Sequence, residues 1–227
     1  MKIIKSNKKA LVVGSTGLIG RHLVEALIEN DSYCKVVLIT RRPLDIKNSK
    51  VVNEVVDFSN LNRCRSIFRG DDLFICIGTT MAKAGSKSAF LKVDFTIPVI
   101  VANLAFQNGV DQCLLVSAAG ADKNSIVFYN KVKGELEFEL KQIGFWGLHI
   151  FQPSILLGER EELRIGERFG QLIGRGLNKW TGDMMGAFKA VEAVDVAEAM
   201  MKTAQRLEPG IYTYPSHIIE KISKGEI

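Results

Sequence analysis

Tyr129 and Lys133 stand four residues apart in a segment with a helical pattern, so their side chains should share one face of that helix. An ammonium group beside a phenol stabilises the tyrosinate and lowers the phenol pKa from about 10 toward neutral pH. Such a tyrosine can donate a proton to a carbonyl oxygen or accept one from an alcohol. Ser117 lies twelve residues before Tyr129, at the end of an apolar run, and could hydrogen-bond the same substrate oxygen. A Tyr-x-x-x-Lys pair is common on ordinary helix surfaces, so its meaning depends on its surroundings.

A glycine-rich turn lies between the first apolar run and the first helical pattern, and it reads GSTGLIG over residues 14–20. Gly14 suits a tight turn, Gly17 lets the backbone approach a diphosphate, and Gly20 permits close packing of helix on strand. The N-terminus of the following helix presents free N–H groups and partial positive charge to phosphates. This context predicts a dinucleotide site, the alternative being a turn that binds no ligand. The residues expected to bind the dinucleotide are Gly14, Ser15, Thr16, Gly17, Leu18 and Ile19.

Two arginines, Arg41 and Arg42, follow the second predicted strand, where an NAD-selective protein would place Asp or Glu. Guanidinium groups can make charge-assisted, bidentate hydrogen bonds to a 2′-phosphate, so this position predicts NADPH or NADP as the cofactor. A solvated basic turn is the alternative. Asp57, at the end of the third predicted strand, is placed to meet the adenine amino group, or else to cap a turn or helix.

Short β-rich runs alternate with helical patterns along most of the chain, which indicates parallel strands joined by crossover helices. We expect a first helix from residue 18 to about residue 29. Open α/β sheets bind ligands at the carboxyl ends of their strands, which is where the residues above lie. The expected strands are residues 10–13, 35–40, 51–56, 73–77, 113–117, 147–152 and 210–214.

The pattern of elements predicts an α/β fold with a Rossmann-type, doubly wound, mostly parallel sheet of six or seven strands. One domain over residues 1–227 is expected, with a core at about 9–158 and a small C-terminal cap at about 159–227 that shapes the substrate cleft. Frequent glycines after Pro153 suggest that the cap is loop-rich. Its clear helical patterns are residues 164–173 and 195–206, followed by a terminal helix from Ser216.

Composition excludes several classes of protein. The 227 residues are 47% hydrophobic and 24% charged, as in an ordinary globular protein. The net charge of +5 includes four lysines before the first apolar run, and the other basic residues alternate with acidic ones, so we expect neither a nucleic-acid nor a membrane partner. The four cysteines are scattered without metal-ligand spacing, which predicts no metal site and a soluble cytoplasmic protein.

The order of these motifs resembles that of the short-chain dehydrogenase/reductase superfamily. The motifs are the glycine loop, residues 76–80 (CIGTT), Ser117, the Tyr129 and Lys133 pair, and residues 151–154 (FQPS). The stretches IGTT, KAGSKSAFLKVD, VSAAGADKNS and YNKVKGELE are together similar to the atypical group of small NADPH-binding, Tat-interacting oxidoreductase-like proteins. The resemblance runs from about residue 10 to about residue 158.

The resemblance implies a role for each matching residue. Tyr129 would be the catalytic acid/base, Lys133 would hold the nicotinamide ribose and tune Tyr129, and Ser117 would orient the carbonyl. The residues implied to border the cofactor are Gly78, Thr79 and Thr80, with Pro153 at its nicotinamide end.

Three positions depart from the family pattern. Asp94 stands where many relatives carry an active-site Asn, Ala118 replaces a second serine, and Gln152 stands where an Arg is common. An ionised carboxylate cannot donate a hydrogen bond as an amide does, so a water-mediated proton relay is weakened.

The leading expectation is an NADPH-dependent reductase of a small carbonyl substrate, acting as a monomer or homodimer. The main alternative, favoured by Asp94 and Ala118, is an NADP(H)-binding redox-sensing or regulatory protein without its own catalysis. A third function, epimerisation or dehydration of nucleotide sugars, is disfavoured because only about 70 residues follow Pro153.

Overall fold

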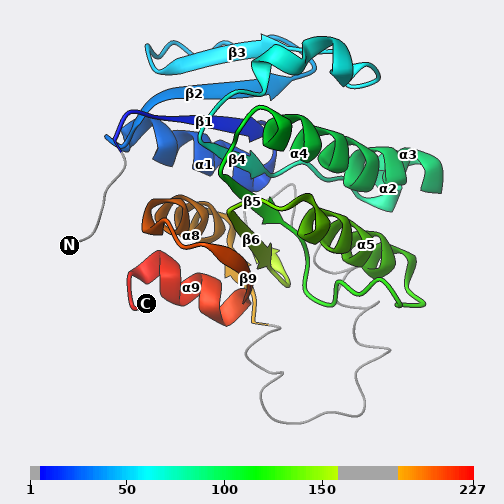
Figure 1. Ribbon diagram of the computed structural model, residues 1–227. Coiled ribbons are helices and arrows are strands. Elements are labelled where there is room, and N and C mark those ends of the chain that lie inside the picture. The colour runs from blue at the N-terminus through cyan, green and yellow to red at the C-terminus, as the bar shows by residue number, and fades with distance from the viewer. Residues whose placement is uncertain (1–5, 158–188) are drawn as a thin grey trace.

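The computed structural model describes residues 6–157 and 189–227, and its centre is a seven-stranded parallel sheet (Figure 1). The strand order is β3-β2-β1-β4-β5-β6-β9. This order confirms the predicted Rossmann-type sheet. From β1 the sheet grows toward β3 on one side and toward β9 on the other, and such sheets bind ligands at the switch point between β1 and β4. The strands are β1 (Lys8–Val13), β2 (Tyr33–Thr40), β3 (Val51–Val55), β4 (Asp72–Ile75), β5 (Gln112–Val116), β6 (Gly147–Gln152) and β9 (Gly210–Pro215).

Helices cover both faces of this sheet, because the strand residues are apolar on both sides. On β1, Ala10 and Val12 enter one buried cluster while Leu11 and Val13 enter the other. The first cluster is closed by α1 (Leu18–Glu29), α8 (Ala193–Arg206) and α9 (Ser216–Lys224). The second is closed by the 3₁₀ helix η1 (Leu61–Ile67), by α4 (Ile97–Gln107) and by α5 (Phe128–Ile143).

A continuous helical run over Lys87–Gln107 changes its winding in the middle. It begins as α3 (Lys87–Leu91), passes through a π-helical turn η2 (Lys92–Thr96) and continues as α4, while a short α2 (Met81–Ala84) precedes it. The run is long and apolar enough to span a membrane, but its buried residues, such as Phe90 and Val101, pack inside this protein. Single π-helical turns occur often at functional sites, and this one carries Asp94.

The C-terminal residues of the described chain complete the core layers. The predicted helix at residues 195–206, strand at 210–214 and terminal helix from Ser216 are confirmed as α8, β9 and α9. β9 pairs in parallel with β6 from Gly147↔Gly210 to Gln152↔Pro215, and α8 packs against α1. A two-stranded sheet joins β7 (Leu156–Leu157) to β8 (Val191–Glu192). The predicted helix at residues 164–173 lies outside the described residues.

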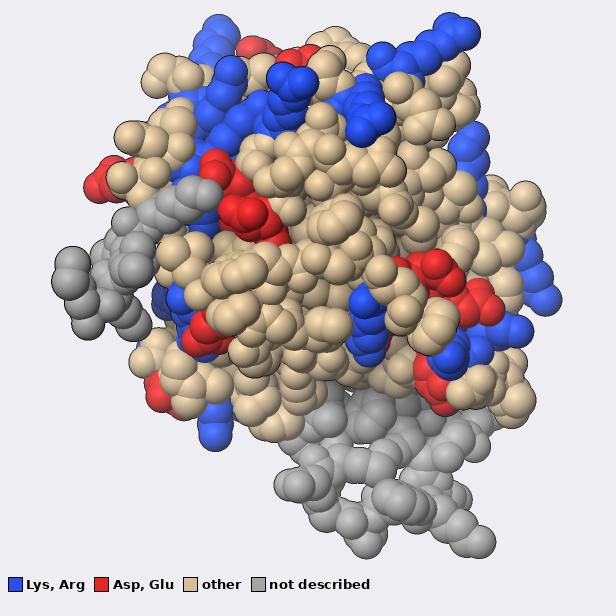
Figure 2. Space-filling model, in the orientation of Figure 1, with Lys and Arg blue, Asp and Glu red and all other residues tan. Residues whose placement is uncertain are grey.

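Charged side chains are unevenly distributed on the face shown in Figure 2. Uncharged atoms dominate the middle of this face, and Lys and Arg side chains gather along its upper edge, over β3 and η1 in the orientation of Figure 1. The same end of the sheet carries Arg41 and Arg42, directly after β2.

Candidate active site

The glycine loop is held tightly between β1, the end of β4 and the start of α1. Gly14 has a φ of +94°, and a Cβ there would lie 2.5 Å from the backbone nitrogen of Ile77. A Cβ on Gly20 would overlap the carbonyl oxygen of Gly14. Both positions therefore require glycine, as the motif predicts. Gly17 is the N-cap residue of α1 and supplies no side chain to cap its N–H groups.

The loop fits a bound diphosphate. The Oγ of Ser15 is buried and has no hydrogen-bond partner among the described residues, so it is available to a ligand oxygen. Apart from its chain neighbours and the helix backbone, the described atoms within 4 Å of a Cβ on Gly17 would be the carbonyl oxygens of Gly14 and Cys76, at 3.3 and 3.8 Å. Thr16 is exposed, whereas Ile19 is buried in the core and could offer a ligand only its backbone.

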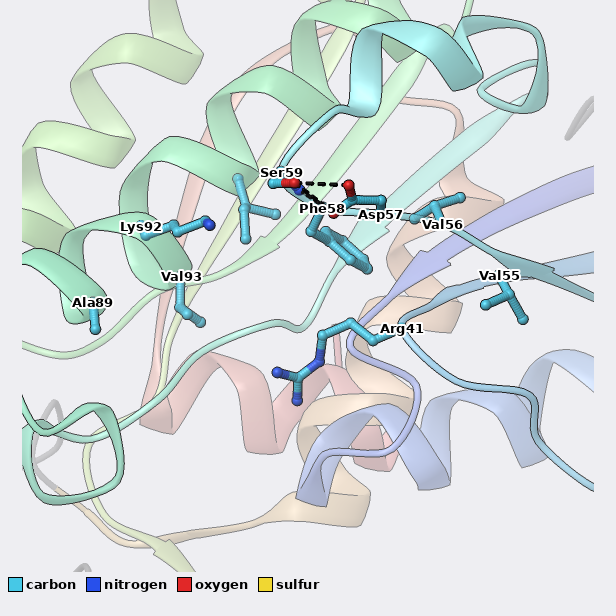
Figure 3. A pocket seen from close by; sticks show the side chains of 10 residues that line it. Arg41, Val55, Val56, Asp57, Phe58, Ser59, Ala89, Lys92 and Val93 are labelled. Atoms are coloured by element: carbon cyan, nitrogen blue, oxygen red, sulfur yellow. Dashed lines mark hydrogen bonds between the residues drawn. The ribbon is translucent and has the colours of Figure 1, made fainter.

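A pocket of about 630 Å³ opens at the ends of β2 and β3 (Figure 3). Arg41 reaches into it from the end of β2, whereas Arg42 does not line it. The carbonyl oxygen of Arg42 accepts a 2.7 Å hydrogen bond from Thr40 Oγ1, which fixes the turn. The residues that line the pocket are Arg41, Val55, Val56, Asp57, Phe58, Ser59, Ala89, Lys92, Val93 and Ile97.

Asp57 caps a turn, which is one of the two interpretations proposed from the sequence, and it also lines the pocket. Its carboxylate accepts the Ser59 N–H at 2.8 Å and the Ser59 hydroxyl at 2.6 Å, so it caps a turn. These bonds lower the pKa of Asp57 and fix its side chain at the pocket wall. Lys92, which the sequence analysis did not select, enters the same pocket from η2 on the opposite side (Figure 3).

Tyr129 and Lys133 share one face of α5, as their spacing predicts. The Nζ of Lys133 lies 6.0 Å from the centre of the Tyr129 ring, and the Lys133 residue is only 4% exposed. The direction of the Tyr129 pKa shift differs from the expectation. Burial raises this pKa and Asp94 adds to the rise, and together they outweigh the opposing charge of Lys133.

Asp94 joins Lys133 to the loop after β4. Its Oδ1 forms a 2.8 Å ion pair with Lys133 Nζ, and its Oδ2 accepts the Thr79 N–H at 2.8 Å. Burial alone lowers the pKa of Lys133, but its acidic neighbours outweigh burial and raise it, so Lys133 is an ammonium ion. A Cβ on Gly78 would lie 3.3 Å from Asp94 Oδ1, so the loop packs directly on this ion pair.

Ser117, directly after β5, is buried against a carboxylate that the sequence analysis missed. Its hydroxyl donates a 2.5 Å hydrogen bond to Glu137 Oε1, which also accepts from Gln152 Nε2 at 2.9 Å. Glu137 follows Lys133 by four residues on α5, and this spacing was the available signal.

Two other predicted residues border this region in different ways. Pro153 is buried, and its carbonyl oxygen accepts the Ala119 N–H at 2.9 Å, which places it beside the end of β5. Thr80 caps α2, because its Oγ1 accepts the Lys83 N–H at 3.2 Å.

Comparison with known proteins places this site in a family. The model of the NAD dependent epimerase/dehydratase family matches residues 10–125. "Protein HTATIP2" of Rattus norvegicus is 35% identical over 200 residues, which are 86% of this chain and 80% of the relative. This relative confirms the resemblance to the Tat-interacting group. "Protein FMP52, mitochondrial" of Candida albicans is 33% identical over 202 residues, covering 86% and 87% of the two chains.

Solved structures show the same fold at lower identity. MoeE5 in complex with UDP-glucose and NAD has a TM-score of 0.68 and 20% identity, over 91% of this chain and 76% of that one. WbmH of Bordetella bronchiseptica in complex with NAD+ has a TM-score of 0.67 and 19% identity, over 96% and 79%. At these identities the likeness concerns the fold alone.

The expectation of a cytoplasmic protein is wrong in light of these relatives. Several fungal relatives, among them those of Candida albicans and Eremothecium gossypii, are named as mitochondrial proteins, which contradicts that expectation. The composition and motifs of the chain, on which the expectation rested, carry no information on the compartment. The matching family model and the two relatives at 33% and 35% identity show that the chain belongs to the NAD dependent epimerase/dehydratase family of NAD(P)-dependent, oxidoreductase-like proteins.

Proposed function

We propose that the protein is an NADPH-dependent reductase that converts a small aldehyde or ketone to an alcohol. The observation that carries this proposal is the grouping of Tyr129, Lys133 and Asp94, which are linked across α5 and η2 beside the Gly78 loop. A phenol next to a buried ammonium ion is suited to proton transfer to oxygen. The family's NAD(P) dependence supplies the reductant that such a site needs.

Residues at two places near the carboxyl ends of the strands would hold the cofactor. The backbone of Gly14–Ile19 and the buried Ser15 hydroxyl would bind the diphosphate at the start of α1. Arg41 would bind the 2′-phosphate from the pocket at the ends of β2 and β3, and Arg42 would add charge from the neighbouring turn. Hydrogen bonds to charged groups are worth about 1.5–3 kcal/mol, which favours NADPH over NADH by roughly 10- to 100-fold.

The chain's own residues would move the proton. When bound, the nicotinamide of NADPH would supply a hydride for the carbonyl carbon and would itself be oxidised. Tyr129 gives its phenolic proton to the carbonyl oxygen, so the product is a neutral alcohol, and the tyrosinate regains a proton from solvent. The raised pKa of Tyr129 keeps the phenol protonated at neutral pH, so a proton is available for this step.

Ser117 would serve this step as a hydrogen-bond acceptor. A hydroxyl has one hydrogen, and Ser117 donates its hydrogen to Glu137. Its lone pairs can then accept from the phenol of Tyr129 or from the product hydroxyl. This assignment narrows the expectation that Ser117 hydrogen-bonds the substrate oxygen and orients the carbonyl, because it leaves Ser117 only the role of acceptor.

The experiment that tests the proposal is turnover of an aldehyde and ketone panel, followed by loss of NADPH absorbance, in wild type and Tyr129→Phe. The phenylalanine variant should lose about 10²- to 10⁴-fold in kcat and keep nearly full NADPH affinity. Tyr212→Phe, at an exposed position on β9, is the matched control and should behave as wild type. Equal turnover by Tyr129→Phe would refute the assignment.

The same panel separates the reductase from the alternative function. The ion pair between Asp94 and Lys133 favours an NADP(H)-binding sensor, because it partly neutralises the ammonium group that tunes Tyr129. Tight NADPH binding by wild type with no reduction of any compound would support the sensor. Reduction of one compound that depends on Tyr129 would exclude it.

A further inference from the structure

Asp94 is placed where it can control the charge that Tyr129 experiences. It lies in the π-helical turn η2, is 1% exposed, and uses both carboxylate oxygens within the site. One oxygen pairs with Lys133 Nζ and the other accepts the Thr79 N–H, each at 2.8 Å. The Asp94 carboxylate on η2 therefore contacts both α5 and the loop after β4.

Among the described residues, the titratable groups that act on Lys133 come from two elements. Tyr129 and Glu137 flank it on α5, one turn before and one turn after, and Asp94 faces it from η2. A buried ammonium ion that is paired with a carboxylate presents a dipole instead of a net charge to its neighbours. The centre of the Tyr129 ring lies 6.0 Å from Lys133 Nζ, so the pairing with Asp94 weakens the electric field of Lys133 at the phenol.

We propose that Asp94 is a positioning residue that holds the Lys133 ammonium group and thereby keeps the phenol of Tyr129 protonated at neutral pH, so that the site donates a proton instead of removing one. This inference rests on the proposed function and gives it a direction: carbonyl reduction near neutral pH, with alcohol oxidation confined to alkaline pH. Burial acts in the same sense, because it raises the pKa of Tyr129.

The substitution Asp94→Asn isolates the charge of the carboxylate. The amide is nearly isosteric, and its oxygen can still accept the Thr79 N–H. Lys133 then loses its opposing negative charge and acts on Tyr129 with a net positive charge. The tyrosinate should become easier to form, so Tyr129 should titrate at lower pH.

The test follows tyrosinate absorbance during alkaline titration of the protein alone. The titration curve of Tyr129 is the absorbance of wild type minus that of Tyr129→Phe. In the Asp94→Asn background it is the absorbance of Asp94→Asn minus that of the variant that carries both Asp94→Asn and Tyr129→Phe. Asp94→Asn should lower the midpoint by at least about one pH unit, a tenfold change in acid dissociation. In Asp94→Glu the Tyr129 midpoint should differ from that of wild type by less than half of this shift. Asp45→Asn, at an exposed site, should leave the midpoint unchanged.

An unchanged or raised midpoint in Asp94→Asn would overturn the inference, since a purely structural Asp94 would affect stability alone. If that variant does not fold, wild type decides: a Tyr129 midpoint above 10 supports the inference and one below 10 contradicts it. The titration needs neither cofactor nor substrate. A lowered midpoint in Asp94→Asn without turnover of any carbonyl by wild type would support the role of Asp94 and count against the reductase.

Discussion

Ser117 and Glu137 form a buried hydrogen bond of 2.5 Å between the end of β5 and the middle of α5. The same Glu137 oxygen accepts from Gln152 at the end of β6, so one carboxylate joins two strand ends to the helix that carries Tyr129. A buried acceptor shared by two donors fixes both of them, because leaving either donor unpaired costs about 1–3 kcal/mol.

Glu137→Ala should therefore lower both turnover and stability, whereas Glu137→Gln should mainly lower kcat. The glutamine oxygen can accept both hydrogen bonds, but without the strength that an ionised acceptor gives. We expect about a tenfold loss of kcat with KM nearly unchanged, measured on a carbonyl that wild type reduces. Glu139→Gln, at an exposed position on the same helix, is the control. Wild-type kinetics in Glu137→Gln would show that the hydrogen bond has no catalytic role.

Arg41 should contribute more to NADPH selectivity than Arg42, because Arg41 lines the pocket and Arg42 does not. Arg41→Ala should weaken NADPH binding by about 10-fold or more and leave NADH binding nearly unchanged. Arg42→Ala should have a smaller effect in the same direction. Calorimetric titration of each variant checks this order, with Arg65→Ala on η1 as the control for net charge. Equal losses for both coenzymes in Arg41→Ala would exclude contact with the 2′-phosphate.

Alanine substitutions at Gly17 and Gly20 should distinguish an effect on cofactor binding from an effect on folding. A methyl group on Gly20 overlaps the Gly14 carbonyl oxygen, so Gly20→Ala should lower the melting temperature by several degrees and abolish binding. On Gly17 the nearest atom is 3.3 Å away, so Gly17→Ala should fold nearly normally and still lose about tenfold or more in NADPH affinity. Thermal unfolding and calorimetry measure the two effects. Normal NADPH affinity in Gly17→Ala would place the diphosphate elsewhere.

His149 should make stability depend on pH in the acidic range. It is fully buried in β6 beside the Tyr214 hydroxyl, and burial lowers its pKa from 6.5 to about 4. Between these values the unfolded chain binds more protons than the folded one, so stability is complete above about pH 6.5 and decreases as pH falls toward 4. The loss is about 3 kcal/mol at most.

Denaturant unfolding at several pH values measures this slope. His149→Gln removes the titrating group and should flatten the dependence between pH 4 and 6.5. His22→Gln, on the half-exposed surface of α1, should keep the wild-type slope. An equally steep slope in His149→Gln would assign the acid sensitivity to other groups.

Much of the sheet could be predicted from the sequence because its strands are buried on both faces and read as continuous apolar runs. The helix α1 was predicted with its observed bounds, since glycines mark its start and its apolar positions repeat with helical spacing. The C-terminal elements α8, β9 and α9 were also predicted, from the patterns at residues 195–206, 210–214 and from Ser216. The frequent glycines between residues 158 and 186 led us to assign the two helices to a cap, whereas both close one face of the sheet.

Side-chain partners within the site could not be predicted in the same way. In the sequence, Glu137 and Lys92 look like members of a solvated helix face. Only the packed structure shows that Glu137 is buried and that Lys92 lines a pocket. The π-helical turn has no sequence signature that we could use. The sequence identified Asp94 as a departure from the family pattern, but its ion pair with Lys133 depends on how η2 and α5 pack together.

The proposed function requires that the turn between β1 and α1 binds the diphosphate of a phosphorylated nicotinamide dinucleotide. Calorimetric titration of the wild-type protein with NADPH and with NADH tests this claim. We predict that NADPH binds at least about 10-fold more tightly than NADH. Absence of binding heat with both coenzymes, or tighter binding of NADH, would contradict it.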